Sequence, residues 1–452
     1  IRGELRRVAG HGRRQAQFRL VTDDAVLERL LDADASLFVG DTARHALGWL
    51  NHPVRYGREL ARWVDVIPRR HRHTVWIGIG GSSSPARALS DGVDNCPLTV
   101  LDTTHPDSIQ GQRFDNVNVV VASKSGTTLE IQVVLAWALG HGLDPRDLAV
   151  ITDEGNSLGE LADSLGAVRI DGDPDTGGRF SALSPFGLVA ALYLGREPEA
   201  LREELEAAHP TPALASRAAD LASRALGSGA ISLPGDPLLS GSALWLDQLV
   251  AESTGKDGRG IFCSPGEPQR FNLVDMMTWE LATALLARGL DVDPFNQPNV
   301  ESSKREVMSI LHKGIGDDWG GDRLAEWPDC LAGSSALHLQ AYAPLTSSDA
   351  VAALRRSLEG ASPVVTANLG PRFLHSTGQF HKGGPAGQVM LQIRQRPQCA
   401  PERIPGRAFS MHDVHAAQFL GDERALQSAG RTVMTVTVDH IDEVAQIGRA
   451  HV

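Results

Sequence analysis

The chain has few cysteines, no long apolar run and no excess of basic residues. Its four cysteines, at positions 96, 263, 330 and 399, form no Cys-x-x-Cys pair, which predicts free thiols in a reducing compartment. No run of about 18 apolar residues and no signal-peptide core is present, so we expect neither a membrane span nor secretion. The net charge of −12 argues against general affinity for nucleic acids. We therefore expect a cytoplasmic protein with a small-molecule partner.

The common nucleotide and metal motifs are also missing. The chain contains neither the GxxxxGK[ST] spacing of a phosphate-binding loop nor the HExxH pattern of a zinc site. A dinucleotide fingerprint in "WIGIGGSSS" fails because Ser83 stands where its last glycine is required. We therefore expect no metal and no organic cofactor.

Short apolar runs that alternate with helical segments predict an α/β fold with parallel sheets. The runs are "VWIGI", "LTVLD", "VNVVVA", "DLAVITD" and "AVRIDG", followed later by "GAISLPG", "GIFCS", "VVTAN", "VMLQIR" and "TVMTVTV". We expect a helical N-terminal segment at 1–70, a first sheet domain at 71–205, a second at 206–400 and a C-terminal segment at 401–452.

Two predicted strands end in turns that are rich in glycine and hydroxyl groups. "VASKSGTTLE" (121–130) and "WIGIGGSSSPARAL" (76–89) both pass from a strand through such a turn into a helix. A helix N-terminus carries unpaired N–H groups and a partial positive charge, and hydroxyl groups add donors, which suits a phosphate. An ordinary helix cap is the alternative, but one cap needs only one hydroxyl. The pair of turns predicts a site for a small phosphorylated metabolite.

The second half of the chain carries candidates for proton transfer. "DQLVAESTGK" places Glu252 at the end of an apolar helix, where a partly desolvated carboxylate suits general-base catalysis. A surface glutamate near a helix end is the alternative. Lys304 lies in "DPFNQPNVESSK", His375 and His381 in "GPRFLHSTGQFHKGG", and Arg179 in "GGRFSALSPFGL".

Five segments are similar, in chain order, to motifs of the phosphoglucose isomerase family: "WIGIGGSS", "SKSGTT", "GGRFS", "ESTGK" and "NQPNVESSK". The turns resemble the sugar-isomerase (SIS) domain, and "FLHSTGQFHKGG" resembles the isomerase half of bifunctional transaldolase/phosphoglucose isomerases. The resemblance covers roughly residues 70–400. It implies two SIS-like, doubly wound parallel-sheet domains with helical N-terminal and C-terminal extensions. It also implies interconversion of glucose 6-phosphate and fructose 6-phosphate through a cis-enediolate.

Carried over position by position, the resemblance implies a catalytic and a substrate-binding set. Glu252 moves a proton between C1 and C2, and Arg179 stabilises the enediolate. Lys304 assists at the ring oxygen, and His375 opens the ring. The implied substrate-binding residues are Gly81, Ser82, Ser123, Lys124, Ser125, Thr127, Thr128 and Gln297.

The sequence departs from the family pattern at several points. The histidine segment usually precedes the lysine segment, whereas His375 follows Lys304 here, and His381 is a rival for the ring-opening role. Asn299 stands in place of a family glycine. In the family the histidine comes from a neighbouring subunit, so the resemblance implies a homodimer with a shared site. An isomerase of another phosphosugar, such as mannose 6-phosphate, and a non-catalytic phosphosugar-binding regulator remain alternatives.

Overall fold

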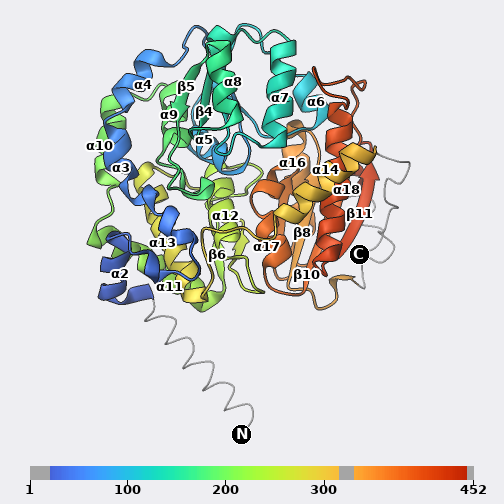
Figure 1. The fold of residues 1–452 in the computed structure, drawn as a ribbon. Coiled ribbons are helices and arrows are strands. Elements are labelled where there is room, and N and C mark those ends of the chain that lie inside the picture. Colours follow the sequence, from blue (N-terminus) through green and yellow to red (C-terminus); the bar gives the residue numbers. More distant parts are fainter. Residues whose placement is uncertain (1–20, 315–329, 445–452) are drawn as a thin grey trace.

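The computed structural model describes residues 21–314 and 330–444 and confirms the predicted α/β architecture (Figure 1). The first sheet has five parallel strands in the order β2-β1-β3-β4-β5. They are β1 Thr74–Ile77, β2 Leu98–Leu101, β3 Asn118–Ala122, β4 Leu148–Thr152 and β5 Val168–Asp171. The chain moves to one side of β1 for β2 and to the other side for β3, so the strand order reverses between β1 and β3. Ligands of open parallel sheets bind at such a point.

Helices cover both faces of this sheet. Alternate side chains of a strand point to opposite faces, and Trp76 and Val120 enter one apolar cluster while Val75 and Val119 enter another. The first cluster includes α5 and α9, and the second includes α6, α7 and α8. These helices are α5 Ser84–Ser90, α6 Pro106–Gln110, α7 Leu129–Gly140, α8 Ser157–Leu165 and α9 Pro185–Tyr193. Burial on both sides explains why the strands read as continuous apolar runs.

The second half of the chain forms a parallel four-stranded sheet and a separate two-stranded pair. The larger sheet has the order β11-β10-β8-β9, and β6 pairs with β7. The strands are β6 Ala230–Ser232, β7 Phe262–Ser264, β8 Ala336–Tyr342, β9 Val365–Leu369, β10 Gln388–Gln395 and β11 Thr432–Val438. The helices are α10 Pro198–Ala207, α11 Pro212–Ser228, α12 Gly241–Thr254, α13 Leu273–Leu290, α14 Glu301–Lys313, α16 Ser348–Ser357, α17 Gly378–Gly383 and α18 Met411–Ser428.

Strand β8 is the one strand of the larger sheets that the sequence reading missed. It lies between β10 and β9 and is buried along its whole length. One face carries Leu337 and Leu339 into an apolar cluster with α16, whereas His338 and Gln340 are buried on the other face. Polar residues at alternate positions made the segment look unlike a buried strand, because a buried parallel strand is normally apolar on both faces.

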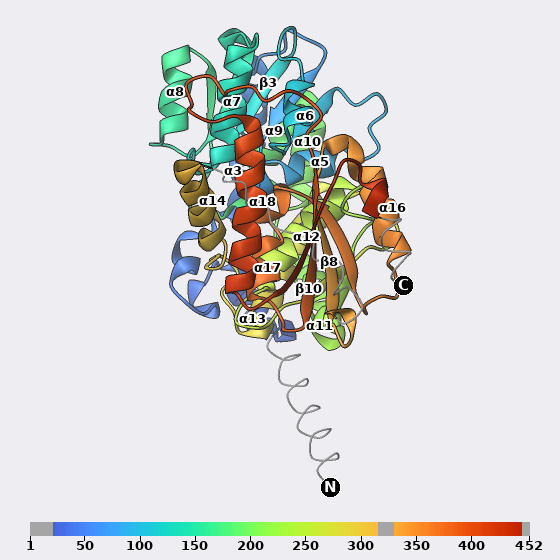
Figure 2. The ribbon, with the colours of Figure 1, turned by 90° about the vertical axis from the view of Figure 1, so that its right-hand side faces the viewer.

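The C-terminal residues belong to the second sheet. Strand β11 pairs with β10 over seven residues, and α18 packs beside α14 (Figure 2). The segment 401–452 was expected to be an extension, but its described part contributes an edge strand and a long helix to the sheet domain. The proposed domain boundaries themselves stay predictions.

The N-terminal described residues form short helices, as predicted. They are α2 Asp24–Leu31, α3 His52–Gly57 and α4 Leu60–Val66, with 3₁₀ turns η1 Ala35–Leu37, η2 Thr42–His45 and η3 Gly48–Asn51. They pack into the same apolar cluster as α12 and α13. Within the described ranges, no helix has the length and apolar character needed to cross a membrane.

Candidate active site

The two predicted hydroxyl-rich turns lie at the carboxyl ends of β1 and β3, on either side of the point where strand order reverses. The turn after β1 contains the short 3₁₀ helix η4, Gly80–Ser82. The turn after β3 leads directly into α7, with Thr128 as its N-cap residue. Three further elements close the site: η6 Gly178–Phe180, the C-terminal half of α12, and η9 Arg372–His375.

Two glycines allow these elements to meet. Gly80 has φ +60°, and a Cβ atom there would lie 2.3 Å from the carbonyl oxygen of His375. A Cβ atom on Gly81 would lie 2.2 Å from the carbonyl oxygen of Gly178. No larger residue fits either position without moving backbone, so the β1 turn brings the η6 and η9 segments together.

Glu252 lies at the centre of this arrangement. Its side chain is buried on α12, one turn after Gln248. Oε1 accepts a hydrogen bond from Nη1 of Arg179 at 3.0 Å, and Oε2 accepts one from Nε2 of Gln248 at 3.0 Å. The structure therefore brings the predicted base and the predicted enediolate-stabilising cation together as a buried ion pair. The surface-glutamate alternative is wrong, because Glu252 is only 4% exposed.

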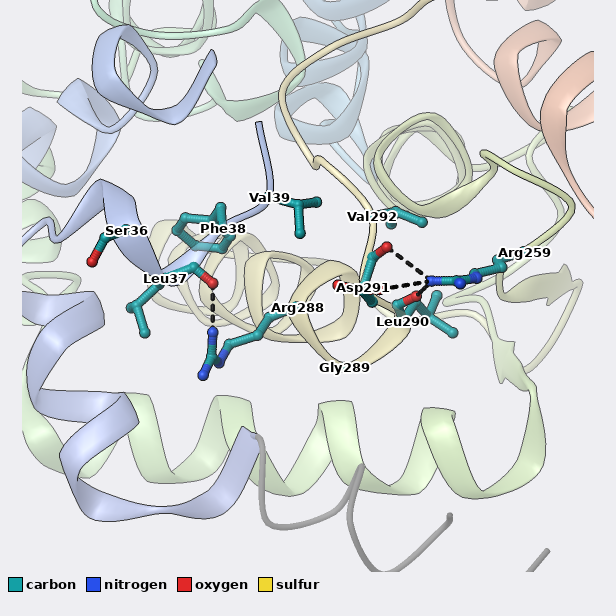
Figure 3. A pocket seen from close by; sticks show the side chains of 10 residues that line it. All are labelled: Ser36, Leu37, Phe38, Val39, Arg259, Arg288, Gly289, Leu290, Asp291 and Val292. Carbon is teal, nitrogen blue, oxygen red and sulfur yellow. Dashed lines mark hydrogen bonds and ion pairs between the residues drawn. The ribbon is translucent and has the colours of Figure 1, made fainter. Parts of the chain in front are cut away.

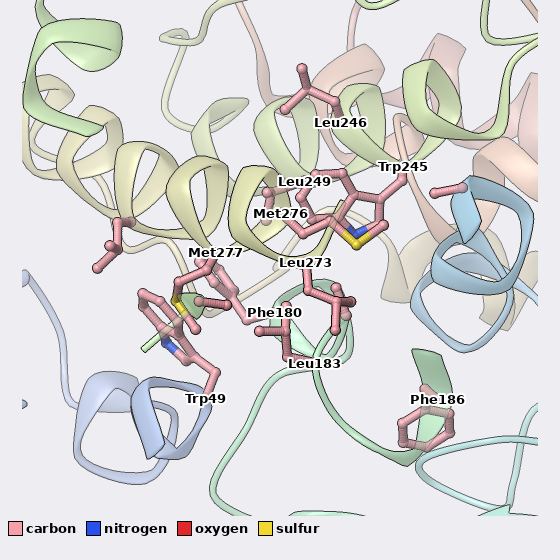
Figure 4. Packing of buried hydrophobic residues seen from close by; sticks show 14 of the residues in the cluster. Trp49, Phe180, Leu183, Phe186, Trp245, Leu246, Leu249, Leu273, Met276 and Met277 are labelled. Atoms are coloured by element: carbon pink, nitrogen blue, oxygen red, sulfur yellow. The ribbon is translucent and has the colours of Figure 1, made fainter. Parts of the chain in front are cut away.

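The backbone holds Arg179 in a fixed orientation. Its Nε donates to the carbonyl oxygen of Pro294 at 3.1 Å, and Nη2 donates to that of Asn296 at 2.6 Å. The next residue, Phe180, is fully buried and packs against Trp49 in the core, with ring centroids 5.1 Å apart (Figure 4). A guanidinium has five N–H groups. The bonds to Glu252, Pro294 and Asn296 use three of these N–H groups. The other two have no partner among the described residues, so Arg179 can donate to a ligand.

His375 is paired with a carboxylate that the sequence reading did not identify. Its Nε2 lies 2.9 Å from Oε1 of Glu130, which is buried in the first turn of α7. The backbone carbonyl of His375 accepts a hydrogen bond from Nε2 of Gln248 at 3.0 Å. Gln248 thus connects Glu252 to the histidine segment, and the His375 side chain connects that segment to α7, the helix that follows the turn after β3.

The turn after β3 keeps its hydroxyl groups largely uncommitted. Among the described residues, the Thr128 side chain makes no capping bond to α7, and its hydroxyl contacts only that of Ser123, at 3.4 Å. The exposed hydroxyls of Ser125 and Thr127 lie 3.1 Å apart. A free helix N-terminus with several available hydroxyls is a suitable anion site.

Lys124 does not point freely into this turn. Its Nζ donates to Oδ2 of Asp153 and, at 2.7 Å, to the carbonyl oxygen of Asp173. The ammonium group is therefore already committed, and its contribution to anion binding is limited to its electrostatic field.

Three other predicted site residues are not brought to Glu252 by a contact of their own. The ammonium of Lys304 pairs with Glu301 at 2.8 Å on an exposed face of α14. Gln297 is exposed in the loop next to Asn296. The Ser82 hydroxyl closes its own turn, since it donates to the carbonyl of Ile79 and accepts from the Ile79 amide.

The two candidate histidines differ in their surroundings. His381 is 4% exposed, its Nδ1 lies 2.8 Å from Nε2 of Gln340, and burial lowers its pKa well below the usual value. His375 is the histidine whose backbone carbonyl accepts from Gln248, the residue that also donates to Glu252, and its ring-opening role stays a prediction. Within one chain, Gln248 donates both to the Glu252 carboxylate and to the backbone carbonyl of His375, and the expectation of a site shared between subunits stays a prediction. The homodimer itself remains a prediction.

A cavity of about 730 Å³ lies elsewhere, between residues 36–39 and 288–292 (Figure 3). Arg259 and Arg288 reach it, but they donate to backbone carbonyls, those of Leu290 and Leu37 respectively. Its lining includes none of the predicted site residues. In the part of the chain that the structure describes, no group of three or more His, Cys, Asp or Glu side chains could hold a metal ion.

Sequence reasoning missed four polar residues of the site region: Glu130, Gln248, Lys256 and Gln418. A signal existed for two of them, since Glu130 and Gln248 interrupt otherwise apolar helices near hydroxyl or carboxylate motifs. Lys256 is buried behind Glu252, where desolvation lowers its pKa to about 6 and the nearby charge of Arg179 acts in the same direction.

Curated proteins that match this chain are similar to it over about half of its length. The glucose-6-phosphate isomerase of Heliobacterium modesticaldum is 30% identical over 256 residues, which cover 48% of this chain and 57% of that protein. That of Rubrobacter xylanophilus is 34% identical over 215 residues, 43% of this chain and 48% of that protein. The matched half of the chain is similar to glucose-6-phosphate isomerases. The matches span only about half the length of these curated relatives, and no family model matches.

A likeness to a solved structure extends over more of the chain but is weak. A glucose-6-phosphate isomerase from Chlamydia trachomatis aligns with 97% of this chain and 85% of its own, at 14% identity and a TM-score of 0.35. At that score the likeness carries no argument about the site.

Proposed function

We propose that the protein is an aldose–ketose isomerase that interconverts glucose 6-phosphate and fructose 6-phosphate. The observation that carries the proposal is the pair of contacts linked by Gln248, the Arg179–Glu252 ion pair and the His375–Glu130 hydrogen bond, beside the N-terminus of α7. Isomerisation needs a base, a cation near the enediolate, a ring-opening group and a phosphate anchor. The similarity of half the chain to glucose-6-phosphate isomerases supports the choice of substrate.

In this proposal the sugar phosphate binds at the α7 N-terminus. The hydroxyls of Thr128, Ser125 and Thr127 and the first backbone N–H groups of the helix would hold its oxygens. The sugar then extends toward Glu252 on α12. Phosphate binding fixes the position of the carbon atoms relative to the base, which is the main contribution of a non-reacting group to the rate.

Proton transfer then falls to Glu252. Its carboxylate takes the proton from C2 of the open-chain aldose and returns it to C1, through a cis-enediolate. The two uncommitted N–H groups of Arg179 donate to the enediolate oxygens, where negative charge develops. The guanidinium already has its position fixed by two backbone carbonyls, so little reorganisation is needed.

Ring opening is assigned to His375. Because Nε2 donates to the Glu130 carboxylate, Nδ1 of the neutral ring is left as the acceptor for the proton of the sugar hydroxyl. Lys304 would need α14 to rearrange before it could assist at the ring oxygen, since it now pairs with Glu301. The geometry supports a mechanism in which Arg179 is the cation near the reacting atoms.

The test follows fructose 6-phosphate by NMR in D₂O with the purified protein. We expect glucose 6-phosphate as product, with deuterium incorporated at C2 of the glucose. Formation of mannose 6-phosphate alone would favour the alternative isomerase, and binding without turnover would favour the regulator. Lys304→Met serves as the comparison variant, and we expect its kcat to stay within about tenfold of the unmodified protein, because its ammonium lies on an exposed helix face.

A dimeric state and a cytoplasmic location complete the proposal. They rest on the family resemblance and on the free cysteines. Sedimentation velocity of the purified protein tests the dimer directly, with a single species of about 48 kDa as the contrary result.

A further inference from the structure

The C-terminal helix α18 reaches the candidate active site through one fully buried side chain, Gln418. Its Nε2 donates to Oε1 of Glu130 at 2.7 Å, and the same oxygen accepts from Nε2 of His375 at 2.9 Å. We propose that Gln418 is a positioning residue that holds the Glu130 carboxylate against His375. The inference rests on the proposed isomerase function, and it gives the segment after residue 400 a role that no motif in the sequence indicates.

The Gln418 amide has a partner at each end. The hydroxyl of Thr104, which follows β2, donates to Oε1 of Gln418 at 2.5 Å. If the amide were rotated by 180°, its oxygen would lie against the Glu130 oxygen and two acceptors would face each other. Burial makes such an unpaired contact costly. The Glu130 carboxylate, which can only accept, therefore selects the rotamer in which Gln418 donates to it, and the Thr104 hydroxyl completes that arrangement by donating to Oε1.

The helix that carries Gln418 is itself fixed relative to His375. The hydroxyl of Tyr342 on β8 donates to the backbone carbonyl of Gln418 at 3.1 Å. The adjacent residue Phe419 packs in an apolar cluster with Phe373 and Leu374, which belong to the same η9 turn as His375. Packed side chains hold α18 and the histidine turn as one unit, so the amide has a constant position.

Two donors on one carboxylate oxygen determine the state of both partners. Burial alone opposes ionisation of Glu130, but the His375 ring, the backbone and the Gln418 amide together lower its pKa below the usual value. The ionised carboxylate holds the proton of His375 on Nε2, which leaves Nδ1 as the acceptor. Loss of the amide would weaken this preference without removing either catalytic group.

The first experiment compares Gln418→Met with the unmodified protein in the fructose 6-phosphate assay. We expect kcat to fall about tenfold, the effect of losing one hydrogen bond to a charged group. KM should change little, because the substitution leaves unchanged the turn after β3, where we propose that the phosphate binds. The acid limb of the kcat/KM profile should move up by roughly 0.5–1 pH unit, because Glu130 loses a donor that favours its ionised form.

Matched variants separate positioning from simple destabilisation. Thr104→Val should lower kcat less than Gln418→Met does, since it removes one hydrogen bond to the Gln418 amide but keeps the amide itself. Gln392→Met removes another fully buried glutamine, which bonds Gln340 and Asp422 instead. It should lower the melting temperature while kcat and the pH profile stay the same. Equal effects of Gln392→Met and Gln418→Met on the pH profile would overturn the proposal.

A double-variant cycle tests whether Gln418 acts through Glu130. In a Glu130→Gln background, Gln418→Met should change kcat less than about twofold, because the carboxylate it positions is gone. Multiplicative effects of the two substitutions would instead show an independent, structural role for Gln418.

A measurement without substrate separates this proposal from the isomerase assignment. In protein labelled with ¹⁵N-histidine, His375 should be the Nε2–H tautomer, with its signal assigned by its absence in His375→Asn. Gln418→Met should give a mixture of tautomers. If the unmodified protein does not isomerise phosphosugars but this change occurs, the function fails and the positioning role stands. If the tautomer is unchanged in Gln418→Met, the positioning role is wrong even when the enzyme is active.

Discussion

Replacement of Glu252 by glutamine separates catalysis from binding most directly. The proposed base lies on α12, and the predicted phosphate site lies at the start of α7, so the substitution leaves the proposed phosphate site unchanged. We expect kcat to fall by at least about 10²–10⁴-fold, the typical contribution of a positioned general base. Binding of a phosphorylated sugar acid, measured by calorimetry, should change little.

The structure also gives the cost in stability. A glutamine at position 252 can still accept from Arg179, but its NH₂ group then faces the NH₂ group of Gln248. Gln248 cannot turn to relieve this contact without placing its Oε1 against the backbone carbonyl oxygen of His375, which now accepts from Nε2 at 3.0 Å. Arg179 also loses its buried counter-charge. Breaking a buried ion pair costs about 3–5 kcal/mol, so urea unfolding should show a loss in that range.

Glu252→Asp is the matched control. It keeps the charge near Arg179 but withdraws the carboxylate by one methylene, so it should lose activity while it retains more of the stability. Coupling product formation to a glucose-6-phosphate dehydrogenase gives kcat for both variants. If Glu252→Gln turned over fructose 6-phosphate at close to the unmodified rate, the assignment of Glu252 as the base would be refuted.

Three further outcomes follow from the geometry. Thr128→Val should raise KM for fructose 6-phosphate about tenfold in steady-state kinetics, with little change in kcat, because the hydroxyl has only a 3.4 Å contact in the free protein; an unchanged KM would remove Thr128 from the phosphate site. A mixture of the Glu252→Gln and His375→Asn proteins, with subunit exchange verified by mass, should recover no activity, since Gln248 links Glu252 to the histidine turn within one chain. Recovered activity would instead support the site shared between subunits. Burial raises the pKa of Glu280 on α13 to about 8, from 4.5 in the unfolded chain. The folded protein then binds more protons between these values, so its stability falls as pH rises from 5 to 8. In urea titrations at both pH values, Glu280→Gln should abolish about 3–4 kcal/mol of that fall, whereas identical pH dependence in the two proteins would contradict the role of Glu280.

The sequence predicted the local elements of the fold well, because local chemistry determines them. Apolar runs predicted ten strands, and the hydroxyl-rich stretch at 123–128 was correctly placed between β3 and α7. Strand β8 escaped because its buried polar face has partners that lie far away in sequence, such as His381 and Gln392. Neither alternation nor composition within 336–342 reveals those partners.

The sequence by itself determined the types of residue available for catalysis: a carboxylate at the end of an apolar helix, a histidine between glycine-rich turns, and hydroxyl groups where a strand becomes a helix. Only the tertiary structure decided which of them lie together. His375 lies 245 residues and Gln418 lies 288 residues beyond Glu130, yet both contact the same carboxylate oxygen of Glu130. Lys304, which a motif singled out, pairs instead with its helical neighbour Glu301. Spacing along the chain fixes contacts only within a helix or a turn, whereas a site built from several elements depends on how the packed core orients them.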